Sequence, residues 1–192
     1  ADGVVTALVA GAGTVTYTVG TGCTRTIGFV VNPLPATITG TAVVCEGSTT
    51  VLSSASGGSA AWSSSDDATA TVGSSSGVVT GVVSGTATIT YTLAAGGCYT
   101  TKEVTVNILP DPIGGTLSVC DDATTNLTNP DAGTWASSNP GVAPITPVTP
   151  TTASVLGAAV GTSTITYVLS TGCQSTKNIT VNPIPAGVTG SL

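Results

Sequence analysis

The fold is decided by the stretch GTATITYTLAAGGCYTTKEVTVNILP, residues 85–110. Its first half alternates apolar residues with threonine, and a period of two gives a strand one apolar face and one hydroxyl face. Four small residues, 94–97, supply a turn. Alternation then resumes until Pro110, which cannot donate a hydrogen bond to a sheet. The stretch therefore predicts a β-hairpin with a cysteine, Cys98, beside its turn.

This hairpin pattern occurs three times, because residues 13–35 and 161–185 repeat it. The cysteine positions give the period: 98 − 23, 173 − 98 and 120 − 45 all equal 75. Self-similarity at a fixed period indicates a repeat architecture. We predict the second half of a repeat in residues 1–35, complete repeats in 36–110 and 111–185, and the first strand of a following repeat in 186–192.

Each complete repeat is expected to contain about seven short strands with turn signals every 8–12 residues, a pattern typical of an immunoglobulin-like sandwich. Residues 36–41 are predicted to form an edge strand, and residues 5–8 a short strand before the first hairpin. The proline-rich segment 144–150 is predicted to be an extended edge segment or loop. The fold class is therefore all-β, with tandem immunoglobulin-like β-sandwich repeats of 75 residues.

The composition excludes several classes of partner. Charged residues are 6% of the chain against a norm of about 25%, and the net charge is −6. The three basic residues form no patch for nucleic acid, and no apolar run approaches the roughly 18 residues of a membrane-spanning helix. Hydrophobic residues, at 41%, fall in alternating runs, which argues against disorder. Neither nucleic acid nor direct membrane insertion is expected.

The cysteines are predicted to form disulfides within each complete repeat. Cys45 and Cys98 are separated by 53 residues, and so are Cys120 and Cys173. This equal spacing and the secreted-type composition favour the pairs Cys45–Cys98 and Cys120–Cys173. Free buried thiols and a metal site are the alternatives, although the chain has no histidine. Cys23 has no partner by the same spacing.

The aromatic residues are predicted to belong to the core. Trp62 and Trp135 lie on the predicted third strand of their repeats, where a single tryptophan usually fills the core, although it can also stack on a ligand. Tyr17, Tyr91 and Tyr167 occupy equivalent positions on the apolar face of the three hairpins.

Candidate catalytic and metal-binding groups are few. Without histidine there is no imidazole base, and no pair of facing carboxylates is evident. The acidic pairs 66–67 and 121–122 lack the ligand spacing of a calcium loop and are predicted to be solvated turns. Asn126 and Asn178 match the glycosylation pattern, which is a weak signal in a threonine-rich chain. We expect no enzyme activity, no cofactor and no metal.

The sequence resembles the group 2 bacterial immunoglobulin-like repeats. The resemblance is carried by GVVTGVVSGTATITY at residues 77–91, by the upstream segments WSSS and VCEG, by the junction VNPLP at 31–35 and by the Gly-Cys hairpin turns. Arrays with such features are typical of giant surface proteins of the Bacteroidetes type, including gliding and adhesion proteins exported by the type IX pathway. The resemblance covers nearly the whole chain and implies a cell-surface location.

The function expected from these features is structural. The repeats are predicted to form an extracellular, rigid, disulfide-stapled rod or filament of a surface adhesin, in which proline-containing junctions act as semi-rigid spacers. Its expected partners are neighbouring repeats, while a glycan or host surface is contacted through another part of the protein. The alternative is a carbohydrate- or protein-binding module, favoured by the insert at 144–150. Because the repeats are cut at both ends, we expect a window of a longer array rather than a polymer subunit.

Overall fold

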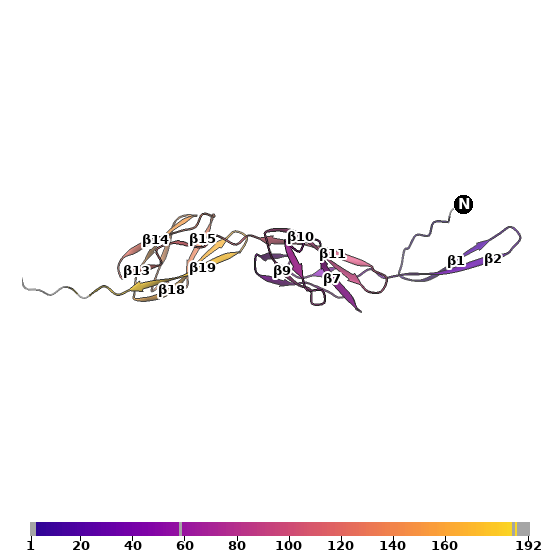
Figure 1. Ribbon diagram of the computed structural model, residues 1–192, viewed down its shortest axis with the longest axis horizontal. Helices are drawn as coiled ribbons and strands as arrows, with labels where there is room; N and C mark the ends of the chain where they lie inside the picture. The colour runs from indigo at the N-terminus through magenta and orange to yellow at the C-terminus, as the bar shows by residue number, and fades with distance from the viewer. Residues whose placement is uncertain (1–2, 58, 186, 188–192) are drawn as a thin grey trace, which may run out of the picture. The chain divides into compact units, whose positions relative to one another are not determined.

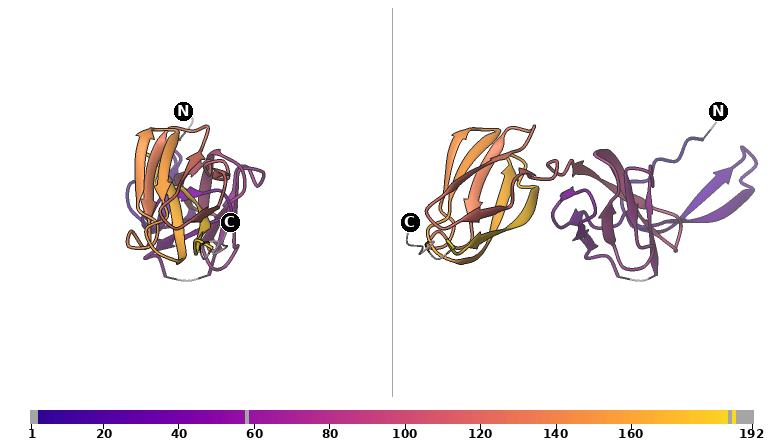
Figure 2. Two further views of the ribbon diagram at one scale, coloured as in Figure 1. Left: turned by 90° about the vertical axis from the view of Figure 1, so that its left-hand side faces the viewer. Right: turned by 60° about the vertical axis from the view of Figure 1, so that its left-hand side comes forward.

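The computed structural model describes residues 3–57, 59–185 and 187. All regular elements in this part of the chain are β-strands, so the prediction of an all-β fold is confirmed. None of the described segments is a helix long and apolar enough to cross a membrane. The chain divides into two compact units, residues 1–106 and 107–192 (Figures 1 and 2). The four repeat ranges predicted from the sequence remain predictions.

The first unit contains one separate hairpin and one sandwich. The hairpin pairs β1 with β2 antiparallel. One layer of the sandwich is the sheet β4-β11-β10-β7, and the other consists of two smaller sheets, β3-β6 and β5-β9-β8. The strands are β1 Gly11–Thr18, β2 Thr24–Val31, β3 Ile38–Thr39, β4 Val43–Cys45, β5 Thr49–Val51, β6 Ser53–Ser54, β7 Ala60–Ser64, β8 Ala70–Val72, β9 Val78–Gly81, β10 Gly85–Leu93 and β11 Tyr99–Asn107, the last of which reaches the unit boundary.

The second unit is a sandwich of two four-stranded sheets. One has the order β13-β19-β18-β15 and the other β12-β14-β17-β16. Strand β13 runs parallel to β19, whereas the other pairs in the two sheets are antiparallel. The strands are β12 Gly114–Gly115, β13 Ser118–Cys120, β14 Thr124–Thr128, β15 Gly133–Ser137, β16 Ile145–Thr149, β17 Thr152–Leu156, β18 Gly161–Leu169 and β19 Gln174–Asn182.

The predicted central hairpin forms as β10 and β11. The buried positions of β10 alternate with partly buried ones, and the buried residues are those predicted to face the core. In the turn, Gly96 and Gly97 have φ values of 81° and 66°, in the left-handed region that glycine adopts without steric cost. The pattern of alternation therefore fixed both the strand and the face that it buries.

The structure corrects two of the shorter predictions and shows which of two alternatives holds for a third. Residues 5–8 are not a strand, since no described strand lies beside them to accept and donate backbone hydrogen bonds. The predicted edge strand at 36–41 is reduced to β3, Ile38–Thr39.

The segment 144–150 forms the edge strand β16, with an irregular register between Pro147 and Thr149. An edge tolerates proline because one side of its ladder has no partner strand. The prediction for 186–192 falls almost entirely outside the described residues.

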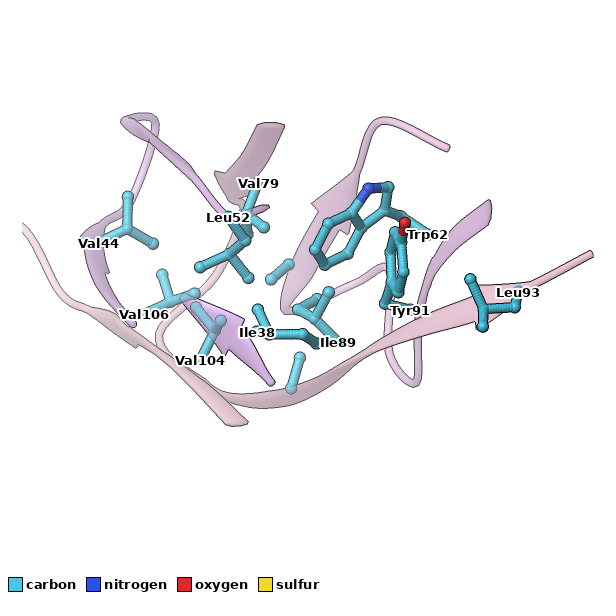
Figure 3. Packing of buried hydrophobic residues seen from close by; sticks show 12 residues of the cluster. Ile38, Val44, Leu52, Trp62, Val79, Ile89, Tyr91, Leu93, Val104 and Val106 are labelled. Carbon is cyan, nitrogen blue, oxygen red and sulfur yellow. The ribbon is translucent and has the colours of Figure 1, made fainter. Parts of the chain in front are cut away.

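Each sandwich has its own core, built from side chains of both layers (Figure 3 for the first unit). In the first, the Trp62 indole lies against the ring of Tyr91, with ring centroids 4.7 Å apart. Trp135 and Tyr167 repeat this pair at 4.5 Å. All four rings are at least 92% buried, because their relative exposures are 8% or less.

The Tyr167 hydroxyl anchors a loop in the second unit. It donates to the backbone carbonyl of Pro150 at 2.8 Å and also lies against the carbonyl of Asp131. Burial raises the pKa of the Tyr167 phenol above its ordinary value, and the nearby Asp131 carboxylate raises it further. The hydroxyl therefore stays a donor at neutral pH.

We expect Trp62→Ala to destabilise the first sandwich by about 3–5 kcal/mol, because it removes a large buried side chain and leaves a cavity beside Tyr91. The measurement is the melting transition of the chain followed by calorimetry. Val51→Ala, at an exposed position, is the control. An unchanged transition in Trp62→Ala would mean that the indole contributes no packing energy.

Candidate functional sites: the cysteine positions and the open hairpin

One cysteine marks the turn of the long hairpin in each sandwich, Cys98 in the first and Cys173 in the second. Cys98 follows β10, and its carbonyl accepts a hydrogen bond from the Leu93 amide. Its sulfur lies 4.0 Å from the carbonyl oxygen of Asn32. The Cys173 sulfur lies 4.0 Å from the carbonyl oxygen of Asn107. We call this end of a sandwich the entry end, because the preceding chain arrives there.

The other two cysteines of the predicted pairs, Cys45 and Cys120, lie at the opposite end of their sandwiches, which we call the exit end. Cys120 ends β13, and its register partner is Asn182, the last residue of β19. Cys45 ends β4 in the first unit. A Cβ atom on Gly81 would lie 2.8 Å from the Cys45 carbonyl oxygen and 2.8 Å from Val106, which places Cys45 near the end of β11.

The predicted pairs Cys45–Cys98 and Cys120–Cys173 are therefore wrong. Cys98 and Cys120 carry free thiols, while Cys45 and Cys173 are disulfide-bonded. The physical reason is the length of the strand between them. Cys173 precedes the first residue of β19 and Cys120 lies opposite its last, so about nine residue steps, or roughly 30 Å, separate them. The Cα atoms of a disulfide are usually less than about 7 Å apart.

Cys23 occupies the turn of the first hairpin and carries a free, exposed thiol. The rest of this hairpin presents an open apolar face. Val15 is 37% exposed and Tyr17 is 70% exposed. A hollow of about 560 Å³ lies over this region and is lined by residues that include Val15, Ile27 and Phe29.

The prediction that Tyr17 is a core residue is wrong, because no opposing strand packs on its ring. Its counterpart Tyr91 is 7% exposed because β7 supplies Trp62, which packs on the ring. In the described residues before β3, no strand other than β1 and β2 is present to do the same for Tyr17. The hairpin thus has the sequence of a sandwich face without the opposing layer.

A second hollow lies beside the proline-rich edge strand. It has a volume of about 550 Å³ and is lined by β16 residues together with Gly133, Thr134 and Trp135. The Trp135 indole N–H is buried and has no hydrogen-bond partner among the described residues. Most of the indole packs in the core, so the hollow exposes little of it.

The acidic residues are dispersed. Asp66 caps a turn: its carboxylate accepts a hydrogen bond from the Thr69 hydroxyl at 2.7 Å and from the Ala68 amide at 3.0 Å. The bond from Thr69, followed by that from Ala68, lowers the pKa of this carboxyl. Within residues 3–57, 59–185 and 187, no three His, Cys, Asp or Glu side chains form a group able to hold a metal ion.

Several solved structures are similar to this chain. Domains 4 and 5 of the S-layer protein SbsC match over 80% of this chain and 100% of theirs, with 18% identity and a TM-score of 0.36. An intimin fragment in complex with the intimin-binding domain of its receptor matches over 89% of this chain and 57% of that chain, with 18% identity and a TM-score of 0.37. The protocadherin GammaB4 extracellular domain matches over 92% of this chain and 42% of that chain, with 10% identity and a TM-score of 0.33.

This chain spans only 36% of a longer SbsC structure. No protein-family model and no curated protein matches it. The assignment of immunoglobulin-like sandwiches therefore rests on the strand topology itself, which is two packed layers with a long hairpin in one of them in each unit.

Proposed function

We propose that the chain is a structural segment of an extracellular surface protein, in which immunoglobulin-like repeats form a stiff rod or filament that carries an adhesive part away from the cell. The observation that carries this proposal is the recurrence of the same sandwich with a cysteine at each end. Strands β4 and β13 begin 75 residues apart, as do β11 and β19. Repetition of one domain lengthens a protein, whereas a catalytic site needs one specialised arrangement of side chains.

The chemistry of the surface supports a non-catalytic role. The chain has no histidine, and its few charged side chains are spread over turns and strands. Disulfide-bonded Cys45 and Cys173 fit an oxidising compartment outside the cytosol. The resemblance to group 2 bacterial immunoglobulin-like repeats extends the proposal to a Bacteroidetes-type surface protein exported by the type IX pathway. Its partners would be neighbouring repeats, with no nucleic acid and no direct membrane insertion.

A rod is distinguished from a flexible string by how its size grows. We expect the radius of gyration of arrays with two, four and six copies of residues 111–185, measured by small-angle X-ray scattering, to rise linearly with copy number. Flexible linkers would give a rise close to the square root. The control array replaces the junction residues Pro183, Ile184 and Pro185 with glycine and serine. Square-root growth of the unaltered array would refute the rod.

A binding module is the second candidate, and the hollow between Trp135 and β16 favours it. Val148, which is 67% exposed, lies at its rim and can be changed without disturbing the core. A glycan that binds the chain on an array and is lost in Val148→Asp would support this function. If no such ligand is found, the structural spacer role is the proposal that remains.

A further inference from the structure

We propose that the hollow between Trp135 and β16 binds a proline-containing segment in the polyproline II conformation, and that a second copy of this chain supplies it through residues 181–185, VNPIP. The inference rests on the binding module that is the second candidate above and names its class of ligand. It does not depend on the stiffness of the repeat array. Both the hollow and the segment belong to the second unit.

A buried hydrogen-bond donor without a partner lines this hollow. The Trp135 side chain is 8% exposed, and its indole N–H has no partner among the described residues. In the equivalent Trp62, the indole nitrogen lies on the ring edge that faces away from Ile38 and Ile89 (Figure 3). Trp135 packs on its tyrosine in the same way, so its N–H edge is turned from the aliphatic core toward the hollow. A ligand that brings an acceptor would remove the unfavourable free energy of this unpaired donor.

The hydroxyl groups that line the hollow already have partners. The Thr134 hydroxyl donates to the backbone carbonyl of Val168 at 3.4 Å. The Thr149 hydroxyl lies 3.1 Å from the hydroxyl of Thr151 and 2.7 Å from that of Thr152. The other lining residues have no polar atom in a side chain apart from the indole: Gly133, Pro147, Val148 and Pro150. We therefore expect the acceptor for the indole N–H to come from a ligand.

The lining of the hollow indicates the chemistry of that ligand. Its volume of about 550 Å³ falls within the range of about 300–1,000 Å³ that ligand pockets have. None of the described residues that line it is charged, so the ligand is expected to be neutral. A polyproline II segment has no internal hydrogen bonds, so its carbonyls are free to accept, and its prolines have no N–H that needs an acceptor. Aromatic-lined grooves recognise such segments in other domains.

A glycan matches this hollow less well. The Trp135 ring packs on Tyr167, with ring centroids 4.5 Å apart, so this ring face is not free to stack on a sugar. A glycan also brings many hydroxyl donors, and the described lining residues include no carboxylate or amide side chain to accept from them. Burial of unpaired hydroxyls is unfavourable. The observations thus favour a peptide.

This chain itself contains a segment of the required kind. Residues 181–185 carry no charge, residues 183–185 follow the end of β19, and Ile184 is 57% exposed. Each proline fixes its own φ, and it also restricts the residue before it to extended backbone. The segment therefore loses little conformational freedom when it binds. Because the hollow and the segment are different surfaces of one copy, the contact can repeat from copy to copy.

Strand β16 is suited to admit the segment. It is an edge strand that pairs only with β17, and its register is irregular between Pro147 and Thr149. Val148 lies between these two residues and is 67% exposed. Few backbone hydrogen bonds therefore oppose an outward shift of this part of β16. We expect such a shift to bring the Trp135 N–H within reach of a bound carbonyl.

The first measurement is the indole N–H resonance of Trp135 in the full chain, followed by nitrogen-15 NMR during titration with the capped peptide VNPIP. The chain has two tryptophans, so the Trp62 resonance is an internal control. We expect the Trp135 resonance to move downfield and to saturate, while the Trp62 resonance stays in place. Trp62→Phe assigns the two signals, because it removes one of them.

Two matched changes make this titration specific. Val148→Asp places a carboxylate at the rim of the hollow and should raise the Kd about tenfold or more. The peptide VNAIA, in which alanine replaces both prolines, should raise the Kd by a similar factor, because it must be ordered on binding. The proposal is wrong if no saturable shift occurs, if both tryptophans shift alike, or if the two peptides bind equally. A shift caused by maltohexaose and not by VNPIP would also overturn it, in favour of a glycan site.

The second measurement tests whether a second copy supplies the segment. Sedimentation should show wild-type chains that associate as concentration rises, whereas Val148→Asp and Ile184→Asp alone should stay monomeric. A mixture of the two variants should form heterodimers, because one keeps the segment and the other keeps the hollow. A wild type that stays monomeric at every concentration, or variants that associate as wild type does, would overturn the role of the second copy. Neither measurement depends on how the radius of gyration grows, so the rod can fail separately.

Discussion

Reduction should lengthen the stretched chain, because Cys45 and Cys173 are disulfide-bonded. A disulfide keeps the residues that it encloses from extending, whereas a free chain can extend by about 3.3–3.6 Å per residue. Adding a reductant opens the bond, and the enclosed residues then contribute their full length.

The measurement is single-molecule pulling from the two termini, with and without a thiol reductant. Cys45→Ser is the genetic equivalent of reduction and should give the long trace without reductant. Cys98→Ser should keep the short trace, because that thiol is free in the structure. Full extension of wild type without reductant would show that no disulfide restrains the chain.

The second large effect concerns the open hairpin β1–β2. A copy of residues 36–74, carrying the change Cys45→Ser, can be placed directly before Ala1, where it supplies counterparts of β3 to β8. We expect Tyr17 to fall from 70% exposed to nearly the 7% of Tyr91. The amides of the hairpin should then gain hydrogen-exchange protection by several orders of magnitude, since opening them would require sandwich unfolding.

The control for this fusion carries Leu52→Asp in the added copy. Leu52 is 1% exposed, so a carboxylate there prevents the new core from closing while the length and composition stay nearly the same. Protection that appears in both fusions would come from mere proximity. If neither fusion protects the hairpin, its apolar face is not the missing half of a sandwich.

The parts of the fold set by local pattern could be read from the sequence. Alternation in residues 85–93 predicted the buried face of β10, and the prolines of 144–150 predicted an extended edge segment or a loop, of which the structure shows the edge strand. The exposure of Tyr17 could not be predicted from the local pattern. Tyr17 and Tyr91 have the same local pattern, and what differs is whether a strand far away in sequence covers them.

The cysteine pairing failed for a related reason. A constant period fixes which positions are equivalent, but an equal spacing between two cysteines does not show that they lie at the same end of a sandwich. Their positions depend on strand direction and register. The parallel pairing of β13 with β19 places Cys120 at the end of the sheet away from Cys173, and nothing in the cysteine spacing indicates that pairing.

The same parallel pair decides how a pull on the second sandwich is resisted. Tension that reaches β13 from the N-terminal side and β19 from the C-terminal side draws these two neighbouring strands in opposite directions along their common axis. Their backbone hydrogen bonds run across that axis and are loaded together in shear, whereas bonds at a peeling edge break one at a time. Strands β13 and β19 thus act as a mechanical clamp, which resists a pull along the chain more strongly than a peeling edge would.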